Sequence, residues 1–245
     1  MSKFADAPAA VPHSAGAIAF RGPDAAKFLQ GQLSADMEQL ATGARTLAGL
    51  HNPQGRVIAL LDVTRHSAEE FVATLPRDLV AAVVARLKKY VLRAKVKIEE
   101  VAAPAPESDA LVAVRNGLPE VLTATSEAFV AQMLNLDLLG AIAFDKGCYT
   151  GQEVIARAHY RGRVKRRMQR WLNASGRPLA PGDSARTADG RTLAVVRVAQ
   201  NENGQQELLA VGNFTATEAA PEPAPADPSA VEVSGPLPLP YSLPE

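Results

Sequence analysis

The sequence predicts an α+β protein, with a body of mixed sheets and helices over residues 16–162 and a small antiparallel β-barrel over residues 163–214. The first part mixes apolar runs of period two with segments whose apolar residues recur at helical spacing. The second part contains only short strand patterns between turns rich in Gly, Asn and Pro, which is typical of a small barrel. Residues 215–245 are dominated by Pro, Ala, Glu and Ser and predict a disordered tail, and residues 1–15 are expected to be loose.

The first half of the body alternates strands with helices. Residues 17–20 form an apolar run that predicts a strand, and Pro23 suits the first turn of the helix that follows. Apolar residues recur at helical spacing from Phe28 to Leu40, which predicts an amphipathic helix, either continuous or broken near residues 34–36. The elements predicted next are strands over residues 45–50, 56–65 and 70–75, a helix over 78–91 and a strand over 92–99.

An Ala/Pro-rich stretch at residues 102–107 predicts a linker inside the body. Beyond it, residues 109–115 have the pattern of a strand and residues 126–139 that of a helix. In the C-terminal part, the predicted strands cover residues 167–174, 183–187, 192–200 and 206–213.

Composition excludes several classes of protein. A chain of 245 residues with 47% hydrophobic content can bury a substantial core, and its 26 basic against 26 acidic residues argue against broad nonspecific nucleic-acid binding. The only cysteine, Cys148, cannot form an internal disulfide or supply a zinc or iron-sulfur site alone, so no metal site is predicted. No run approaches the ~18–20 apolar residues of a membrane span. The N-terminus lacks a basic start followed by an apolar core, so we expect a cytoplasmic protein without membrane contact.

The stretch from Asp145 to Glu153 is unusual because it places Lys, Cys, Gln and Glu among glycines. Packing alone does not favour such a mixture, whereas a loop that approaches a ligand with its backbone needs glycines, here Gly147 and Gly151. Thr150 is predicted to cap a short helix, with Glu153 completing a capping box. Capping by itself leaves the lysine, the cysteine and the glutamine unexplained.

The run Lys-Gly-Cys-Tyr-Thr-Gly-Gln-Glu at residues 146–153 resembles the signature of the YgfZ family of folate-binding proteins, which are relatives of the aminomethyltransferase (T-protein) of the glycine cleavage system. Further matches lie at residues 22–33, 53–57 and 90–93, so that the resemblance covers most of residues 17–165. It implies a T-protein-like body that binds tetrahydrofolate. It also implies a factor that assembles or repairs iron-sulfur clusters in client enzymes, including those that modify tRNA.

Cys148 has two interpretations, a small buried apolar residue or a functional thiol. A nearby lysine, Lys146, and a helix start just downstream favour the reactive thiolate, so we assign the thiol and the lysine to the chemistry of the site. Redox sensing, thiol transfer and transient ligation of a metal shared with a client protein all remain open.

The resemblance implies that the folate lies in a central cavity, with its pterin against a carboxamide and a carboxylate. The glutamate tail of the folate is expected to reach two arginines of the basic run at residues 157–170. An RNA phosphate, the acidic face of a partner protein and a plain solvated strand face are alternatives for that run. The residues assigned to folate binding are Gln152, Glu153, Tyr149, Gly151, Arg161 and Arg163.

One departure from the T-protein pattern concerns catalysis. Aminomethyltransferases of this fold carry an Asp-Asp pair soon after a Gly-Gly turn, and the corresponding positions are Ala59 and Leu60. A leucine cannot orient or deprotonate an amine, so an accessory protein is favoured over an aminomethyltransferase. A folate-dependent one-carbon transferase and an RNA-binding module remain the alternatives, and the oligomeric state is left open. His51 and His66 are not at metal-ligand spacing and are assigned turn and surface roles.

Overall fold

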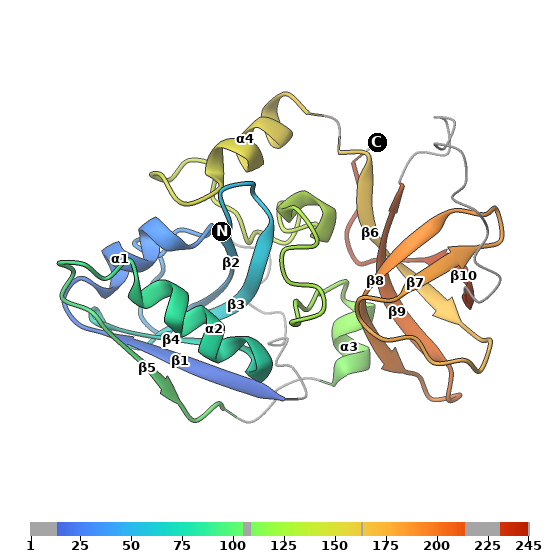
Figure 1. Ribbon diagram of the computed structural model, residues 1–245, viewed down its shortest axis with the longest axis horizontal. Helices are drawn as coiled ribbons and strands as arrows, with labels where there is room; N and C mark the ends of the chain where they lie inside the picture. Colours follow the sequence, from blue (N-terminus) through green and yellow to red (C-terminus); the bar gives the residue numbers. More distant parts are fainter. Residues whose placement is uncertain (1–13, 105–108, 163, 214–230, 245) are drawn as a thin grey trace.

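The computed structural model describes residues 14–104, 109–162, 164–213 and 231–244. Figure 1 shows an N-terminal sheet with helices α1 and α2, a C-terminal sheet on the other side of the molecule, and helix α3 between the two. The elements before the signature loop are β1 (Ala15–Arg21), α1 (Ala25–Gln32), β2 (Arg45–His51), β3 (Val57–Arg65), β4 (Glu70–Pro76), α2 (Arg77–Lys88), β5 (Lys97–Val101), α3 (Ala110–Arg115) and the 3-10 helix η1 (Ala131–Leu134). The mixed α and β composition of the predicted fold is confirmed.

The N-terminal sheet is antiparallel throughout and has the strand order β2-β3-β4-β1-β5. Strand β1 pairs with both β4 and β5 and buries five consecutive residues, from Gly16 to Phe20, as expected of an interior strand. Helix α2 packs across β1, β4 and β5 with Leu79, Val83 and Leu87, the apolar face predicted from their spacing. These contacts build the core of the body.

The C-terminal sheet contains β6 (Arg166–Asn173), β7 (Ser184–Thr187), β8 (Thr192–Gln200), β9 (Gln206–Asn213) and β10 (Val231–Leu237). Its pairing order, β10-β6-β9-β8-β7, closes on itself because β10 pairs with β6 on one side and with β7 on the other. The prediction of short paired strands is confirmed. The four predicted strands pair antiparallel, as expected, but the ring also contains β10, which was not predicted and runs parallel to β7.

The predicted disorder of residues 215–245 is wrong where the structure describes this tail. Val231 and Val233 alternate into the interior of the closed sheet and are 7% and 3% exposed. Further along, the Tyr241 hydroxyl donates a hydrogen bond to the Gly117 carbonyl at 2.9 Å and accepts one from the Asn135 amide at 3.2 Å. The composition of the whole tail concealed this short β pattern. Residues 214–230, like residues 1–13 and 105–108, lie outside the described parts of the chain.

The outer face of the C-terminal sheet joins the hydrophobic core of the body, because β9 is buried on both faces. Leu208 and Ala210 point into the closed sheet beside Trp171, whereas Leu209 and Val211 point the other way and join the core of the body. A continuous apolar core therefore links the sheet to the body.

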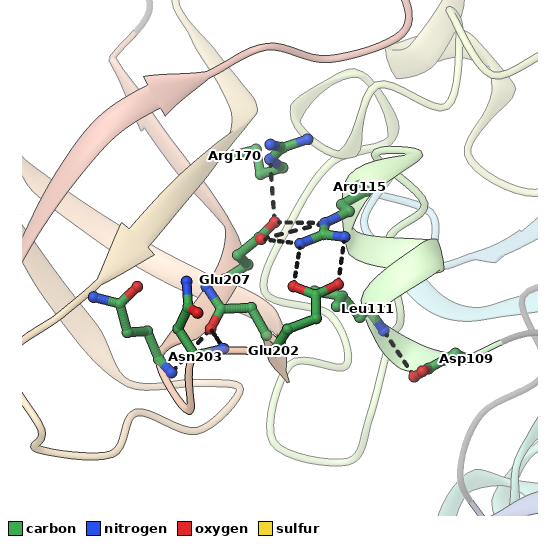
Figure 2. Close-up of polar contacts among 9 residues, drawn as sticks. Asp109, Leu111, Arg115, Arg170, Glu202, Asn203 and Glu207 are labelled. Atoms are coloured by element: carbon green, nitrogen blue, oxygen red, sulfur yellow. Dashed lines mark hydrogen bonds and ion pairs between the residues drawn. The ribbon is translucent and has the colours of Figure 1, made fainter.

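Polar contacts reinforce the same junction, as Figure 2 shows. Arg115, at the end of α3, donates hydrogen bonds to the carboxylates of Glu202 and Glu207 at 2.8–3.3 Å. The Glu207 side chain is 6% exposed, and Arg170 lies 3.5 Å from its other oxygen. Glu207 is thus a buried carboxylate held by two arginines, one from the body and one from the sheet.

Two predicted elements of the body are wrong. Residues 109–115 form helix α3, because the Asp109 carboxylate accepts a hydrogen bond from the Leu111 amide and caps the helix. Residues 126–139 form turns around the short η1 rather than one helix, since Glu127 and Asn135 adopt positive φ angles of 60° and 57°. Both segments are short apolar runs, for which spacing alone does not separate helix from strand or turn.

Candidate functional site

The signature loop, residues 146–151, leads into helix α4 (Gln152–Tyr160). Gly151 is the N-terminal cap of α4 and has a left-handed backbone with φ +83°. No side chain caps this helix, so the predicted capping box of Thr150 and Glu153 is wrong. The loop instead enters α4 through a backbone conformation that favours glycine.

Gly151 also presses against the turn between β2 and β3. A Cβ atom at Gly151 would lie 2.5 Å from the Asn52 carbonyl oxygen and 3.1 Å from the Gly55 Cα. Gly55 itself faces Val154 and Ile155 of α4, at 3.1 Å and 3.4 Å from the position of its missing Cβ. The glycines therefore allow two backbone segments, about a hundred residues apart in sequence, to pack directly on each other.

Lys146 anchors the other end of the loop. It is 9% exposed, and its ammonium reaches into the end of helix α1. The Nζ atom donates hydrogen bonds to three carbonyls, those of Gln30 at 2.8 Å, Leu33 at 2.7 Å and Ala35 at 2.7 Å. Carbonyls at a helix C-terminus lack intrahelical donors and attract a cation. Burial lowers the pKa of Lys146 to about 8, an effect that the charges of Asp36 and Glu38 oppose.

Cys148 is a free, exposed thiol between these two anchors. The ammonium of Lys146 is bound to the carbonyls of α1, a role that the sequence did not indicate. Whether this lysine favours the thiolate stays a prediction. Gln152 is half-buried and donates a long hydrogen bond of 3.4 Å to the Lys146 carbonyl. Glu153 has an 86% exposed side chain and pairs with Arg157 at 3.1 Å.

Two residues beneath the loop are buried. Tyr149 is 7% exposed, its ring lies 5.1 Å from the Lys146 ammonium, and burial raises its pKa to about 12. His51 is 0% exposed and lies 6.1 Å from the Tyr149 ring, so the predicted turn or surface role is wrong for it. Neither imidazole nitrogen forms a hydrogen bond of good geometry in the described structure, although the Gly49 backbone lies close enough to oppose the effect of burial on the pKa. Burial lowers the pKa of His51 to about 4, so the ring is neutral at pH 7.

The basic run divides into structural and exposed members. Arg167 is 3% exposed and forms a bidentate pair with Asp137 at 2.8 and 2.9 Å, and Arg170 faces Glu207. Arg161 is exposed at the end of α4. Arg163 lies outside the described residues. The structure thus leaves Arg161 and Arg157 as the exposed cations next to the signature loop.

An aromatic cluster lies at the end of α4. Phe144 and His159 stack with ring centroids 3.8 Å apart and an interplanar angle of 17°. Tyr160 stands almost perpendicular to both, with centroids 6.0 and 4.8 Å away. In the sequence, Tyr160 is distinguished only by its place inside the basic run at residues 157–170. The part that Phe144 plays in this cluster could not be predicted, because Phe144 precedes the signature loop in sequence whereas the other two rings follow it.

The positions that correspond to the acidic pair of aminomethyltransferases are apolar and buried. Ala59 is 0% exposed and Leu60 is 6% exposed, both in β3. The nearest carboxylate in sequence, Asp62, lies 4.0 Å from an Arg45 nitrogen. The strand therefore offers no carboxylate at the two positions.

Two surface depressions border the C-terminal sheet. One is lined by residues including Asn173 and Gln205, the other by residues including Asp109 and Val198, and neither is lined by the signature loop. Among the residues described, no group of three or more His, Cys, Asp or Glu is arranged to hold a metal ion. No helix in these parts of the chain has the length and apolar character needed to cross a membrane.

Comparison with known proteins identified clear relatives, although no family model matches the chain. An uncharacterized protein of Haemophilus influenzae is 31% identical over 191 residues, 62% of this chain and 68% of that protein. The tRNA-modifying protein YgfZ of Edwardsiella ictaluri is 30% identical over 267 residues, 77% of this chain and 80% of that protein. Its namesake in Pectobacterium carotovorum is 29% identical over 78% of this chain and 79% of that protein.

A solved structure has the same fold. The glycine cleavage system aminomethyltransferase T of Bartonella henselae matches with a TM-score of 0.57 at 14% sequence identity, over 81% of this chain and 76% of that chain. At this identity the match concerns the fold alone. It confirms the predicted likeness to the T-protein body.

Proposed function

Because the chain belongs to the YgfZ family, we propose that it is a tetrahydrofolate-binding factor that serves the assembly or repair of iron-sulfur clusters in client enzymes. Two findings support this proposal. The relatives are named tRNA-modifying proteins, which supports a link to enzymes of tRNA modification. The fold is that of an aminomethyltransferase of the glycine cleavage system, which supports a folate-related function.

The observation that carries the proposal is the anchored signature loop. Lys146 fixes one end of the loop to α1 through three carbonyls, and Gly151 fixes the other end against Asn52. The segment between them exposes Cys148, and Gln152 and Glu153 follow at once. A loop anchored at both ends presents these groups with little loss of conformational entropy on binding.

The exposed groups fit a folate. Glu153 pairs with Arg157, and both side chains are more than 70% exposed. An exposed ion pair of this kind contributes little free energy, so a ligand that donates hydrogen bonds can replace it. A pterin edge carries such donors, and the neighbouring carboxamide of Gln152 offers both a donor and an acceptor. In this proposal Arg161 and Arg163 hold the carboxylates of the glutamate tail, and Tyr149 and Gly151 shape the loop beneath the pterin.

Cys148 is proposed to be the functional thiol, and Lys146 to position the loop that carries it. An exposed thiol next to the folate site is accessible to the iron-sulfur centre of a client enzyme, which is the substrate here. The apolar residues at positions 59 and 60 argue against aminomethyl transfer. Turnover of methylene-tetrahydrofolate by the purified protein would instead favour the alternative, a folate-dependent one-carbon transferase.

Calorimetric titration with tetrahydrofolate, in monoglutamyl and polyglutamyl forms, tests the folate site. We expect micromolar binding that Glu153→Ala weakens at least tenfold and that Cys148→Ala leaves unchanged. Glu69→Ala, which removes an exposed carboxylate from the turn between β3 and β4, is the matched control. Absence of binding of either folate form to the wild-type chain would refute the folate proposal.

A separate assay tests the thiol. In cells that lack the gene, the activity of an iron-sulfur enzyme of tRNA modification should fall, and the wild-type gene should restore it. Cys148→Ala should bind tetrahydrofolate normally and fail to restore this activity. Full restoration by Cys148→Ala would exclude the thiol from the function.

A further inference from the structure

Helix α4 is attached to the body by a narrow contact. Of its nine residues only Ile155 is buried, and the Ile155 carbonyl accepts a hydrogen bond of 2.7 Å from the Gln132 side chain. Val154 is 41% exposed and Tyr160 68% exposed. An amphipathic helix normally turns its large side chains toward a core, so this helix has an apolar and aromatic surface that the described chain covers only in part.

The rings at the end of α4 are arranged as a surface rather than as a core. Phe144 and His159 stack at 3.8 Å, and Tyr160 meets both of them at a steep angle. His159 and Tyr160 are exposed, and Phe144 is partly buried beneath them. Because Tyr160 is 68% exposed, much of its ring remains accessible to a ligand despite these two contacts.

Two guanidinium groups lie close to this cluster in sequence, one within α4 and one at its C-terminal end. Arg157 is 71% exposed and pairs with the exposed carboxylate of Glu153. Arg161 follows Tyr160 directly, is exposed, and pairs with no carboxylate among the residues that the structure describes. The combination of an open aromatic face with adjacent cations matches a ligand that carries flat rings and phosphates along one strand.

We propose that Tyr160, braced by Phe144 and His159, stacks with an unpaired base of RNA, while Arg157 binds a neighbouring phosphate. The site itself would accept any single-stranded nucleic acid, and the choice of RNA over DNA rests on the proposed function, which links the chain to enzymes of tRNA modification. An equal number of acidic and basic residues in the chain means that attraction to RNA is local, so the contact covers only a few nucleotides. This places the RNA contact at the end of α4, one helix away from Cys148.

Fluorescence anisotropy with a labelled, unmodified tRNA transcript tests the stacking site on the full chain. Stacking contributes about 1–3 kcal/mol per base, so Tyr160→Ala should weaken tRNA binding roughly 5- to 150-fold, whereas Tyr160→Phe should bind like wild type. Tyr90→Ala is the matched control, because Tyr90 is 46% exposed and lies at the end of α2.

Salt dependence separates stacking from phosphate contacts. Tyr160→Ala should leave the slope of log affinity against log salt unchanged, because it removes no charge. Arg157→Gln should reduce the slope by about 0.7, the contribution of one phosphate contact on a single strand. A fully duplex RNA should bind less tightly than the tRNA, since its bases are not free to stack on a side chain.

Three outcomes overturn the proposal: no tRNA binding by the wild-type chain, equal binding by Tyr160→Ala, or equal binding of duplex RNA. If tRNA does not bind but Tyr160→Ala still abolishes restoration of the client enzyme in cells, the surface docks a protein instead. The folate titration keeps the two proposals distinct, because Tyr160→Ala should bind tetrahydrofolate normally. If the wild-type chain does not bind folate, the outcome of the tRNA-binding assay still decides the RNA proposal.

Discussion

Replacing Gly151 by alanine should destabilise the protein and weaken folate binding, because two features of the structure exclude a Cβ atom at this position. The backbone has φ +83°, a left-handed conformation that costs a residue with a side chain about 1–2 kcal/mol. The new methyl group would also lie 2.5 Å from the Asn52 carbonyl oxygen, and an overpacked contact of this kind costs about 1–3 kcal/mol. Alanine restricts the unfolded chain, which returns about 0.4–1 kcal/mol. We therefore expect a net loss of about 2–4 kcal/mol.

Gly147 is the matched control within the same loop. Its φ angle is not in the left-handed region, and no heavy atom of the described structure lies within 4 Å of the position of its missing Cβ. Gly147→Ala should change the free energy of unfolding by less than about 1 kcal/mol. Both variants are compared by urea unfolding followed by circular dichroism, and by calorimetry with tetrahydrofolate. Equal stability of the two variants would refute the packing argument. Normal folate affinity of Gly151→Ala would show that the signature loop does not contribute to folate binding.

Three further predictions concern buried charge and protonation. In the same urea assay, Lys146→Met should lower the free energy of unfolding by about 2–4 kcal/mol, because it leaves three carbonyls without their hydrogen-bond donor. The control Lys27→Met, on the exposed side of α1, should change the free energy of unfolding by less than about 0.5 kcal/mol. Burial lowers the pKa of His51 from 6.5 to about 4 in the folded protein. As pH falls, His51 is therefore protonated in the unfolded chain before it is protonated in the folded one, and about 3 kcal/mol of stability is lost between pH 6.5 and pH 4. His51→Gln should lack this part of the pH dependence, and identical pH profiles would contradict the assignment. Glu207→Gln should lower the free energy of unfolding, because it removes the buried carboxylate that pairs with Arg115 and Arg170. Glu202→Gln, on the exposed side of Arg115, should leave the urea unfolding curve unchanged.

Local patterns were sufficient for much of the fold. The strand predicted over residues 192–200 coincides with β8, and those over 45–50, 70–75 and 206–213 agree with observed strands to within one residue. Alternation of apolar residues and adjacent turns is encoded within each segment, so no distant contact is needed to recognise it. Strand β10 was missed for the opposite reason. Its partners β6 and β7 lie some forty to seventy residues upstream, and the Pro-rich composition around it points to disorder.

The segment that forms the candidate site could be predicted from the sequence, but the partners of its side chains in space could not. The residue types of the loop indicated function, yet the acceptors of Lys146 are more than a hundred residues away in sequence. The basic run shows the same limit. Arg167 looks in sequence like any other member of the run, but it is buried by its pair with Asp137, whereas Arg161 remains exposed. Which cations are available to a ligand is decided by carboxylates elsewhere in the chain, and a run of charges does not contain that information.

The two ends of the signature loop are fixed by different physical means, and this has a consequence for Cys148. Lys146 is bound to α1 by charge-assisted hydrogen bonds, whereas Gly151 packs against the β2–β3 turn by close backbone contact. Both anchors adjoin the main core, which includes Leu33 at the end of α1 and Val57 after the turn. The backbone on either side of Cys148 is therefore tied to the core, while the thiol itself is exposed. Under the proposed function, a folate and a partner protein would meet the sulfur on a loop whose two ends are already ordered.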